Sequence, residues 1–218
     1  MYRPASFAED RPDVLLDAVR RIGLAAFVTP GADGIEVTHA PVVARQDEGG
    51  RIVLETHVAR ANPHWRAAAA GADMPSVAIF QGPHSYVTPA WYPSKTKHGK
   101  VVPTWSYISV HAHGPLEAVE DEAWLRAHLD ALTEANEAGR EAPWAVTDAP
   151  DSFVAALSRG IVGLRMVADR IEGAWKINQH KPAPDRDGTR DGLAHAGPMG
   201  AALAQELSAR VDGTTDQA

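Results

Sequence analysis

The sequence predicts one α+β domain built around an antiparallel β-barrel. Six or more short runs rich in β-branched residues lie along the chain, with helical runs inserted between them and no regular β-α-β alternation. A Gly-rich dinucleotide turn and a Walker pattern are both missing from the sequence, which disfavours a Rossmann or P-loop domain. The length of 218 residues suits one sizeable hydrophobic core.

The composition excludes several kinds of site. The net charge is −7, from 21 Lys and Arg against 28 Asp and Glu, so the chain as a whole repels nucleic acid and any DNA contact would need a local basic patch. Cysteine is absent, which excludes disulfides, thiolate metal sites and cysteine nucleophiles. No apolar run is long enough for a membrane span and the first residues lack a signal-peptide layout, so we expect a cytoplasmic protein without a membrane partner.

The first half of the chain predicts one helix and then a series of strands. Apolar residues at helical spacing, with Pro12 in the first turn, predict a helix over residues 10–22. Three β-branched runs separated by turn residues predict an antiparallel meander over residues 23–29, 35–45 and 51–59. A short helix over residues 63–70 and two strands, 74–82 and 84–88, should follow.

The second half predicts strands that enclose two helices, and then a tail. Strand character returns over residues 106–120, and Asp121 should cap a helix with an apolar side formed by Trp124, Leu125, His128, Leu129 and Leu132. A short helix over residues 151–158 and closing strands within 160–177 come next, and a last helix spans 198–210. We assign residues 1–210 to a single domain and 211–218 to a flexible tail.

The segment from Thr56 to Trp65 predicts an anion site. Asn62 and Pro63 are typical of a helix start, with asparagine as the cap and proline in the first turn. Free backbone N–H groups and the positive end of the helix dipole would then lie beside Arg60, which can bind a phosphate bidentately. A capped helix next to a surface arginine is the alternative interpretation.

The segment from Trp91 to Trp105 predicts a second binding surface. Its aromatic side chains enclose three lysines and a histidine, a combination that suits a planar anionic ligand. The chain has only five lysines, and they fall in two short segments: Lys95, Lys97 and Lys100 in this one, Lys176 and Lys181 in a later one. A hairpin that packs in a dimer interface is the alternative.

Other candidate sites have weaker support. His111 and His113 share a strand face and could form a metal pair with His39 or His57, but no HExxH pattern or carboxylate at ligand spacing accompanies them, so we predict no metal site. No Gly-x-Ser-x-Gly elbow marks a nucleophile, and the catalytic residues stay open. Trp175 and Lys176, with a nearby amide side chain, could cover a ring edge or an acidic group.

Taken in order, these segments resemble the PaiB family, FMN-binding negative transcriptional regulators related to the pyridoxamine-phosphate-oxidase-like split barrels. The resemblance rests on stretches such as VTHAPVV, HVARANPHW, FQGPHSYVTPAWYPSKTKHGKVVPTWSY and IVGLRMVADRIEGAWKINQHKP, and it extends from residue 1 to about residue 193. It implies a six-stranded split β-barrel with peripheral helices, a two-fold homodimer, and FMN at the subunit interface.

The resemblance also implies which residues contact FMN. The phosphate would lie at the strand end and helix start, Trp105 and its strand neighbours would face the flavin, and the Trp175 segment falls where related oxidases contact ring and substrate. The predicted contacts are Thr56, His57, Arg60, Asn62, Lys95, Trp105, Tyr107, Ser109, Trp175, Lys176 and Gln179. The basic strand of the oxidases is replaced here by the uncharged residues 39–44, which disfavours vitamin-phosphate oxidation and leaves Lys95, Lys97 or Lys100 to supply positive charge.

Three functions follow as expectations. The family implies a flavin-binding regulator that acts indirectly, since the acidic chain lacks a helix-turn-helix signature. The alternative is an FMN-dependent oxidoreductase for an unknown small molecule, in which His98 or His111 relays a proton. A haem-binding or haem-degrading protein is a third expectation, compatible with the ten histidines.

Overall fold

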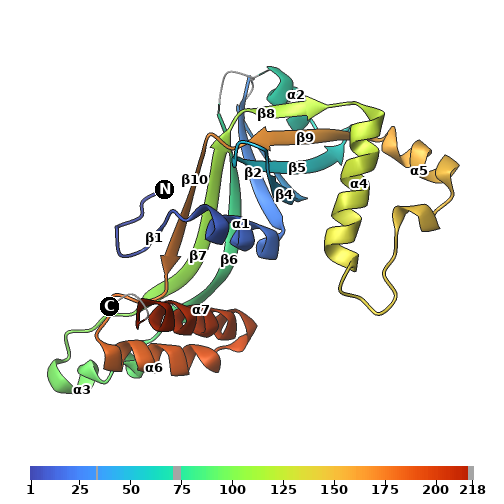
Figure 1. Ribbon diagram of the computed structural model, residues 1–218. Helices are drawn as coiled ribbons and strands as arrows, with labels where there is room; N and C mark the ends of the chain where they lie inside the picture. The colour runs from blue at the N-terminus through green and yellow to red at the C-terminus, as the bar shows by residue number, and fades with distance from the viewer. Residues whose placement is uncertain (33, 71–74, 216–218) are drawn as a thin grey trace. The chain divides into compact units, whose positions relative to one another are not determined.

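The computed structural model describes residues 1–32, 34–70 and 75–215 (Figure 1). These residues form two compact units, each described by itself below. The first unit comprises Met1–Asp10, Gln81–Val110 and Glu172–Ala218, and the second comprises Arg11–Phe80 and His111–Ile171. The assignment of residues 1–210 to one domain stays a prediction, and residues 216–218 of the predicted tail lie outside the described residues.

Antiparallel sheets and helices confirm the α+β class. One sheet has six strands in the order β1-β10-β7-β6-β2-β3, and the other has four in the order β4-β5-β9-β8. The pairs β2 with β3, β4 with β5, and β5 with β9 are all antiparallel. Three strands have residues in both units: β6 (Ser76–Val87), β7 (Thr104–Gly114) and β10 (Arg170–Lys176).

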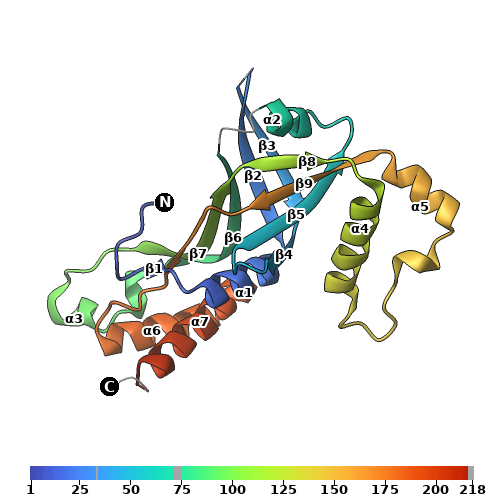
Figure 2. The ribbon, with the colours of Figure 1, turned by 45° about the horizontal axis from the view of Figure 1, so that its top comes forward.

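The second unit holds most of the strands and four of the α-helices. Its strands are β2 (Leu24–Gly31), β3 (Gly34–Pro41), β4 (Val43–Gln46), β5 (Ile52–Ala59), β8 (Leu116–Val119) and β9 (Ile161–Val167). Its helices are α1 (Pro12–Ile22), α2 (His64–Ala70), α4 (Glu122–Glu137), η2 (Val146–Asp148) and α5 (Asp151–Ser158). The hairpin of β2 and β3 lies beside α2 (Figure 2). Buried side chains such as Phe27, Leu54 and Leu164 form the hydrophobic core of the second unit.

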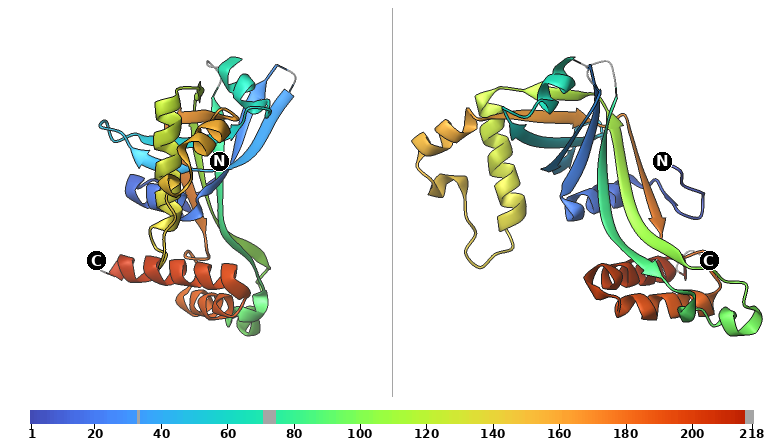
Figure 3. Two further views of the ribbon diagram at one scale, coloured as in Figure 1. Left: turned by 90° about the vertical axis from the view of Figure 1, so that its right-hand side faces the viewer. Right: turned by 180° about the vertical axis from the view of Figure 1, so that it is seen from behind.

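The first unit is built from two helices packed side by side (Figure 3). These are α6 (Ala183–Ala194) and α7 (Gly197–Thr215), and Leu193, Leu203 and Leu207 are buried on them. The remaining elements of this unit are β1 (Ala8–Glu9), η1 (Pro89–Trp91) and α3 (Ser94–His98). Tyr92 and Trp175 are the largest buried side chains of the unit.

The predicted helices at residues 10–22 and 151–158 are confirmed, and so is a helix that Asp121 caps. Helix α1 buries Leu15, Leu16 and Val19 and ends at Gly23, whose left-handed backbone (φ 68°) lets its N–H donate to the carbonyl of Val19. The side chain of Asp121 accepts a hydrogen bond from the Trp124 N–H at 2.7 Å and thereby caps α4.

Two strand predictions were wrong in detail. Residues 35–45 form two strands in different sheets, because Pro41 lacks an N–H and the N–H of Val42 donates instead to the carbonyl of Gly23. Residues 76–87 form the single strand β6 where two strands were predicted. The pairing of β2 with β6 covers Val77 to Ile79, so Pro83 lies beyond it and removes no hydrogen bond on that edge.

The tail prediction was incomplete. The last helix is present, but it begins at Gly197 and runs to Thr215, and α6 precedes it where no helix was predicted. Two glycines within α6 weaken its helical signal in the sequence. No helix of the described residues is both long enough and apolar enough to cross a membrane.

Candidate functional site

A hollow of about 360 Å³ lies on the first unit, between strands β6 and β7. Gln81 and His84 of β6 line it together with Trp105 and Tyr107 of β7. Trp105 is 54% exposed, which is unusual for a side chain with so large an apolar surface. The hollow therefore has an open aromatic wall.

Two further aromatic rings, those of Tyr86 and His84, lie close to the Trp105 ring at this hollow. The Tyr86 ring is 48% exposed and lies 6.3 Å from the Trp105 ring in an edge-to-face arrangement, and the His84 ring lies 6.2 Å away. The ammonium of Lys176 lies 5.7 Å from the centre of the Tyr107 ring. Such a surface can stack on a flat aromatic ligand and place a positive charge near its edge.

Strand alternation explains why these side chains meet. His84 and Tyr86 are two residues apart on β6, and Trp105 and Tyr107 are two apart on β7, so each pair points to one face. The strands approach closely at Gly82, where an added Cβ would lie 3.2 Å from the carbonyl oxygen of Ile108. A glycine at this point lets the two aromatic pairs come together.

Two predicted FMN contacts of the first unit are held by the protein itself. Trp175 is fully buried, its Nε1–H donates to Glu206 at 3.1 Å, and the Arg210 guanidinium lies 4.8 Å from its ring. The Gln179 amide accepts from the Ile177 N–H at 3.0 Å and donates to the carbonyl of Ser6 at 2.7 Å. Their contact with FMN stays a prediction.

The other predicted contacts of this unit differ in exposure. Ser109 is buried in β7, whereas Trp105 is exposed and Tyr107 and Lys176 are partly exposed. Lys95 is exposed on α3. The structure therefore brings Trp105, Tyr107 and Lys176 together at one accessible surface.

The four predicted phosphate residues lie in the second unit. Asn62 caps α2 as predicted, because its Oδ1 accepts from the His64 N–H at 2.9 Å. Its Nδ2 donates to the Thr38 hydroxyl at 3.1 Å. The buried hydroxyl of Thr56 donates to the carbonyl of Pro41 at 2.6 Å.

Arg60 is the most engaged of these residues. Its guanidinium donates to the carboxylate of Glu120 and to the carbonyls of Arg159, at 3.0 Å, and Ile161, at 3.2 Å. These bonds hold the ends of β5 and β9 together. The phosphate role of Thr56, His57, Arg60 and Asn62 stays a prediction.

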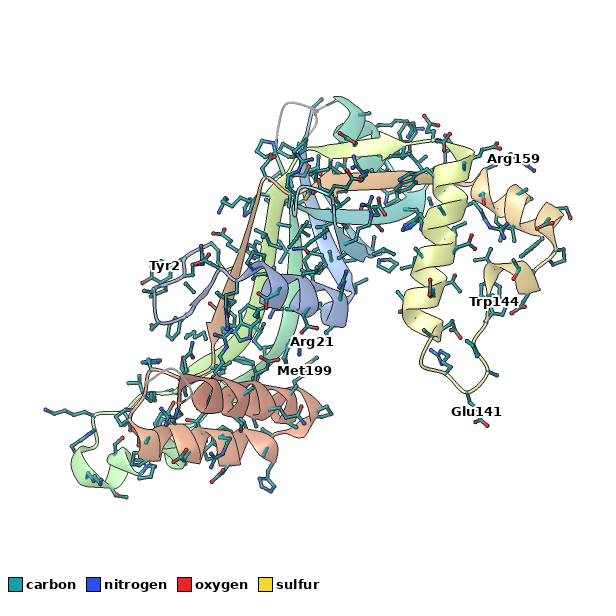
Figure 4. The ribbon with its side chains drawn as sticks, viewed as in Figure 1. Tyr2, Arg21, Glu141, Trp144, Arg159 and Met199 are labelled. Atoms are coloured by element: carbon teal, nitrogen blue, oxygen red, sulfur yellow. The ribbon has the colours of Figure 1, made fainter. Side chains whose placement is uncertain are left out.

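Arg60 also lines a hollow of about 580 Å³ between α4 and α5. Three arginines (Arg60, Arg126 and Arg159) and three acidic residues (Glu120, Glu122 and Asp151) line it, together with apolar side chains such as Leu125 and Val154. Arg159 directly follows α5, whereas Trp144 precedes η2 at the other end of the same segment (Figure 4). The charges of this hollow balance, so it does not favour an anion.

His57 belongs to a buried histidine pair. Its Nδ1 lies 3.1 Å from Nε2 of His128, and the Trp124 ring is stacked on the His128 ring with centres 5.2 Å apart. Burial lowers the pKa of His57, and burial with the charge of His57 lowers the pKa of His128 to about 4. Both rings are therefore neutral at pH 7.

The family to which the chain belongs follows from its sequence similarity to known proteins. Residues 1–170 match the model of a family described as "Putative FMN-binding domain". The chain belongs to this FMN-binding domain family. FMN is the cofactor that membership of the family assigns to it.

Two individual relatives are similar to this chain over most of its length. The chain is 30% identical over 230 residues to the uncharacterized protein AN0679 of Emericella nidulans, with 90% of this chain and 92% of that protein covered. It is 27% identical over 185 residues to the protease synthase and sporulation protein PAI 2 of Bacillus subtilis, with 85% of each covered. This second similarity confirms the resemblance to the PaiB family.

A solved structure agrees on the fold. The FAD and heme binding protein of Mycobacterium smegmatis superposes with a TM-score of 0.55 at 19% identity, covering 77% of this chain and 71% of that one. At this identity the likeness concerns the fold alone. It supports the α+β architecture with antiparallel sheets in the FMN-binding domain family.

Sequence reasoning missed three residues around the hollow of the first unit: Gln81, His84 and Tyr86. The signal that could have found them is the two-residue period of the FQGPHSYVT strand, which places His84 and Tyr86 on one face. The predicted break between two strands at Gly82 and Pro83 separated Gln81 from the strand that carries His84 and Tyr86.

Proposed function

We propose that the protein is an FMN-dependent oxidoreductase in which the flavin ring stacks on Trp105. The single observation that carries this proposal is the exposed indole in an open hollow beside Tyr107 and Lys176. A planar tricyclic ring suits an aromatic wall with a cation at its edge, so the residues fit the ring of FMN. When bound, FMN supplies hydride and electron transfer.

Each residue of the hollow has a role that its geometry supports. Trp105 and Tyr107 bind and orient the ring by stacking, and the Lys176 ammonium favours negative charge near it. His84 donates from Nδ1 to the carbonyl of Gly82 at 3.3 Å, which leaves Nε2 able to accept a proton at the hollow. The open side of the hollow admits a small-molecule substrate.

An absorbance titration with FMN tests the proposal. Binding should shift the absorption bands of the added FMN in a saturable way, and Trp105→Ala should weaken FMN binding by about 1 kcal/mol, roughly fivefold, because a stacking surface is lost. Trp144→Ala is the matched control, since Trp144 is 48% exposed but lies in the other unit (Figure 4).

Equal effects of the two substitutions would contradict stacking on Trp105. Anaerobic NADPH should then bleach the bound flavin, and a flavin that stays oxidised with every reductant tried would contradict the oxidoreductase. A Soret band after addition of haem, without flavin uptake, would favour the haem alternative. An Arg60→Ala variant in the same titration examines the predicted phosphate contact.

We further propose that the chain is a split-barrel homodimer joined through one face of the β2–β3 hairpin. Leu24, Ile35 and Val37 are 52%, 71% and 55% exposed. Val37 pairs with Val28, and Ile35 with Pro30, so these side chains share one apolar sheet face. Apolar patches of this kind usually mark an interaction site.

Charge on this face should produce monomers. Val37→Asp would bury an unpaired carboxylate in the interface, so sedimentation should show mainly the 23.3 kDa monomer. Val102→Asp is the control, because Val102 is 73% exposed in the first unit and its substitution should leave the mass unchanged. A Val37→Asp protein of unchanged mass would rule out this interface.

A negative regulatory role is the second candidate, and the similarity to PAI 2 of Bacillus subtilis favours it. The net charge of −7 favours indirect regulation, through the flavin or its substrate, over direct binding of DNA. The oxidoreductase and the regulatory role are compatible, because an enzyme that converts a small-molecule signal also controls the response to that signal.

A further inference from the structure

All five lysines of the chain belong to the first unit. Lys95 and Lys97 lie on α3 and Lys100 follows it, while Lys176 ends β10 and Lys181 lies in the turn after it. The chain has sixteen other basic side chains, all arginines. The two lysine segments are 76 residues apart in the sequence, counted from Lys100 to Lys176.

The fold joins these two segments directly. The Asn178 amide donates to the Tyr92 hydroxyl at 3.0 Å, and the Lys181 ammonium lies 4.6 Å from the centre of the Tyr92 ring. Ser94, the first residue of α3, donates to Asp185 from its backbone N–H at 3.0 Å and from its hydroxyl at 2.6 Å. The lysine segments are thus fixed side by side through buried groups.

Asn178 forms the turn after β10 that brings the second lysine segment to the first. It has a left-handed backbone (φ 67°), the one such residue other than glycine among those described. Its carbonyl accepts from the Lys181 N–H at 3.0 Å, and its amide also donates to the Thr189 hydroxyl at 3.3 Å. The turn directs Lys181 towards α3.

None of the five lysines forms an ion pair with the described residues, although the charge of Lys181 helps to lower the pKa of the nearby Asp185. Many arginines of the described residues form ion pairs with acids, whereas none of the five lysines, all of them described, takes part in one. Residues 81–110 contain no Asp, Glu or Arg. Partial desolvation and the charges of Lys181 and Lys176 lower the pKa of His180, which places both ammonium groups near one ring.

We propose that Lys95, Lys97, Lys100, Lys176 and Lys181 form a binding surface for a nucleotide that carries at least two phosphate groups. Even with Lys176 at the edge of the flavin ring, four ammonium groups without an ion pair exceed what a single phosphate needs, and compact ammonium groups suit several phosphates at once. Tyr86, in the same unit, offers an exposed ring for its base. The role of this nucleotide as electron donor rests on the proposed oxidoreductase function.

The charge of the chain argues against a longer nucleic acid as the ligand. A local cationic surface on a protein of net charge −7 attracts a small anion at short range but opposes a polyanion that extends over the acidic remainder. The binding should therefore favour a mononucleotide or dinucleotide over an oligonucleotide.

Calorimetric titration with ADP and with NADP⁺, at about 50 mM salt, tests the surface. The double substitution Lys97→Gln and Lys100→Gln should weaken binding of both about five- to tenfold, with a smaller difference at about 0.5 M salt. The double substitution Arg21→Gln and Arg51→Gln removes two charges from the second unit and should leave the affinity unchanged. Lys97→Arg with Lys100→Arg should retain most of the binding.

Several outcomes would overturn the proposal. These are an absence of ADP and NADP⁺ binding at millimolar concentration, equal losses in the lysine and arginine variants, and tighter binding of an oligodeoxythymidylate than of ADP. FMN titration of the same proteins separates the two hypotheses. If FMN fails to bind while ADP binds through the lysines, the flavin function fails and the nucleotide surface stands; if the lysine variant loses only FMN, the reverse holds.

Discussion

The protein should lose about 2 kcal/mol of its free energy of unfolding between pH 6.5 and pH 5 because of His128 alone. The His128 ring is buried, it is stacked on Trp124, and its Nδ1 has no hydrogen-bond partner among the described residues. A charge on this ring would be desolvated and would face His57. Protonation of the folded protein is therefore strongly opposed.

The sign of the effect follows from the two states. The pKa of His128 is about 4 in the folded protein and about 6.5 in the unfolded chain. Above pH 6.5 both states hold a neutral ring and the stability is complete. Below pH 6.5 the unfolded chain binds a proton that the folded protein does not, so stability falls by about 1.4 kcal/mol per pH unit until the pH approaches 4.

Urea unfolding at pH 7, 6 and 5 measures this loss. The His128→Gln variant should be less stable at pH 7 but should lose about 2 kcal/mol less on acidification than the wild-type protein. His39→Gln removes an exposed histidine of the same unit and should follow the wild-type curve. Parallel curves for wild type and His128→Gln would show that His128 does not carry the pH dependence.

The second large effect is expected at Gly188 of α6. A Cβ added there would lie 2.0 Å from the backbone carbonyl oxygen of Trp91, and one added at Gly192 would lie 2.2 Å from the Trp91 ring. The helix rests directly on this segment, so either methyl group forces the two apart. Overpacking costs about 3 kcal/mol, and the better helix propensity of alanine offsets about 1 kcal/mol, which leaves a net loss of about 2 kcal/mol.

Thermal and urea unfolding of Gly188→Ala measure this loss, with Gly139→Ala as the control because no atom lies within 4 Å of its Cβ position. The two sites on α6 should differ in their response to a second substitution. Trp91→Ala should restore part of the stability of Gly192→Ala, since it removes the ring, but not that of Gly188→Ala, since the carbonyl remains. A stable Gly188→Ala protein would contradict the close approach.

Helices could be predicted from the sequence where apolar residues follow the helical period clearly. Helix α5 was predicted with its observed bounds, α1 within two residues, and α4 with its cap at Asp121, because apolar spacing and capping residues agree there. The prediction failed where tertiary contacts override local signals. Helix α6 contains Gly188 and Gly192 because Trp91 lies against it, and these same glycines concealed the helix in the sequence.

The candidate site was predictable only in part for similar reasons. Trp105, Tyr107 and Lys176 could be found from composition and family resemblance, and the structure brings them together. The contact between the two lysine segments depends on the hydrogen bonds of Asn178 and Asp185, which join positions about ninety residues apart. No local pattern encodes such pairs.

The left-handed conformation of Asn178 limits which residues could replace it. Glycine would adopt the same backbone without strain, but it has no amide to offer Tyr92 and Thr189. A β-branched residue would be excluded by the backbone itself. Loss of this amide would therefore remove one of the hydrogen-bonded links between the lysine segments, and the hydrogen bonds from Ser94 to Asp185 would still join them.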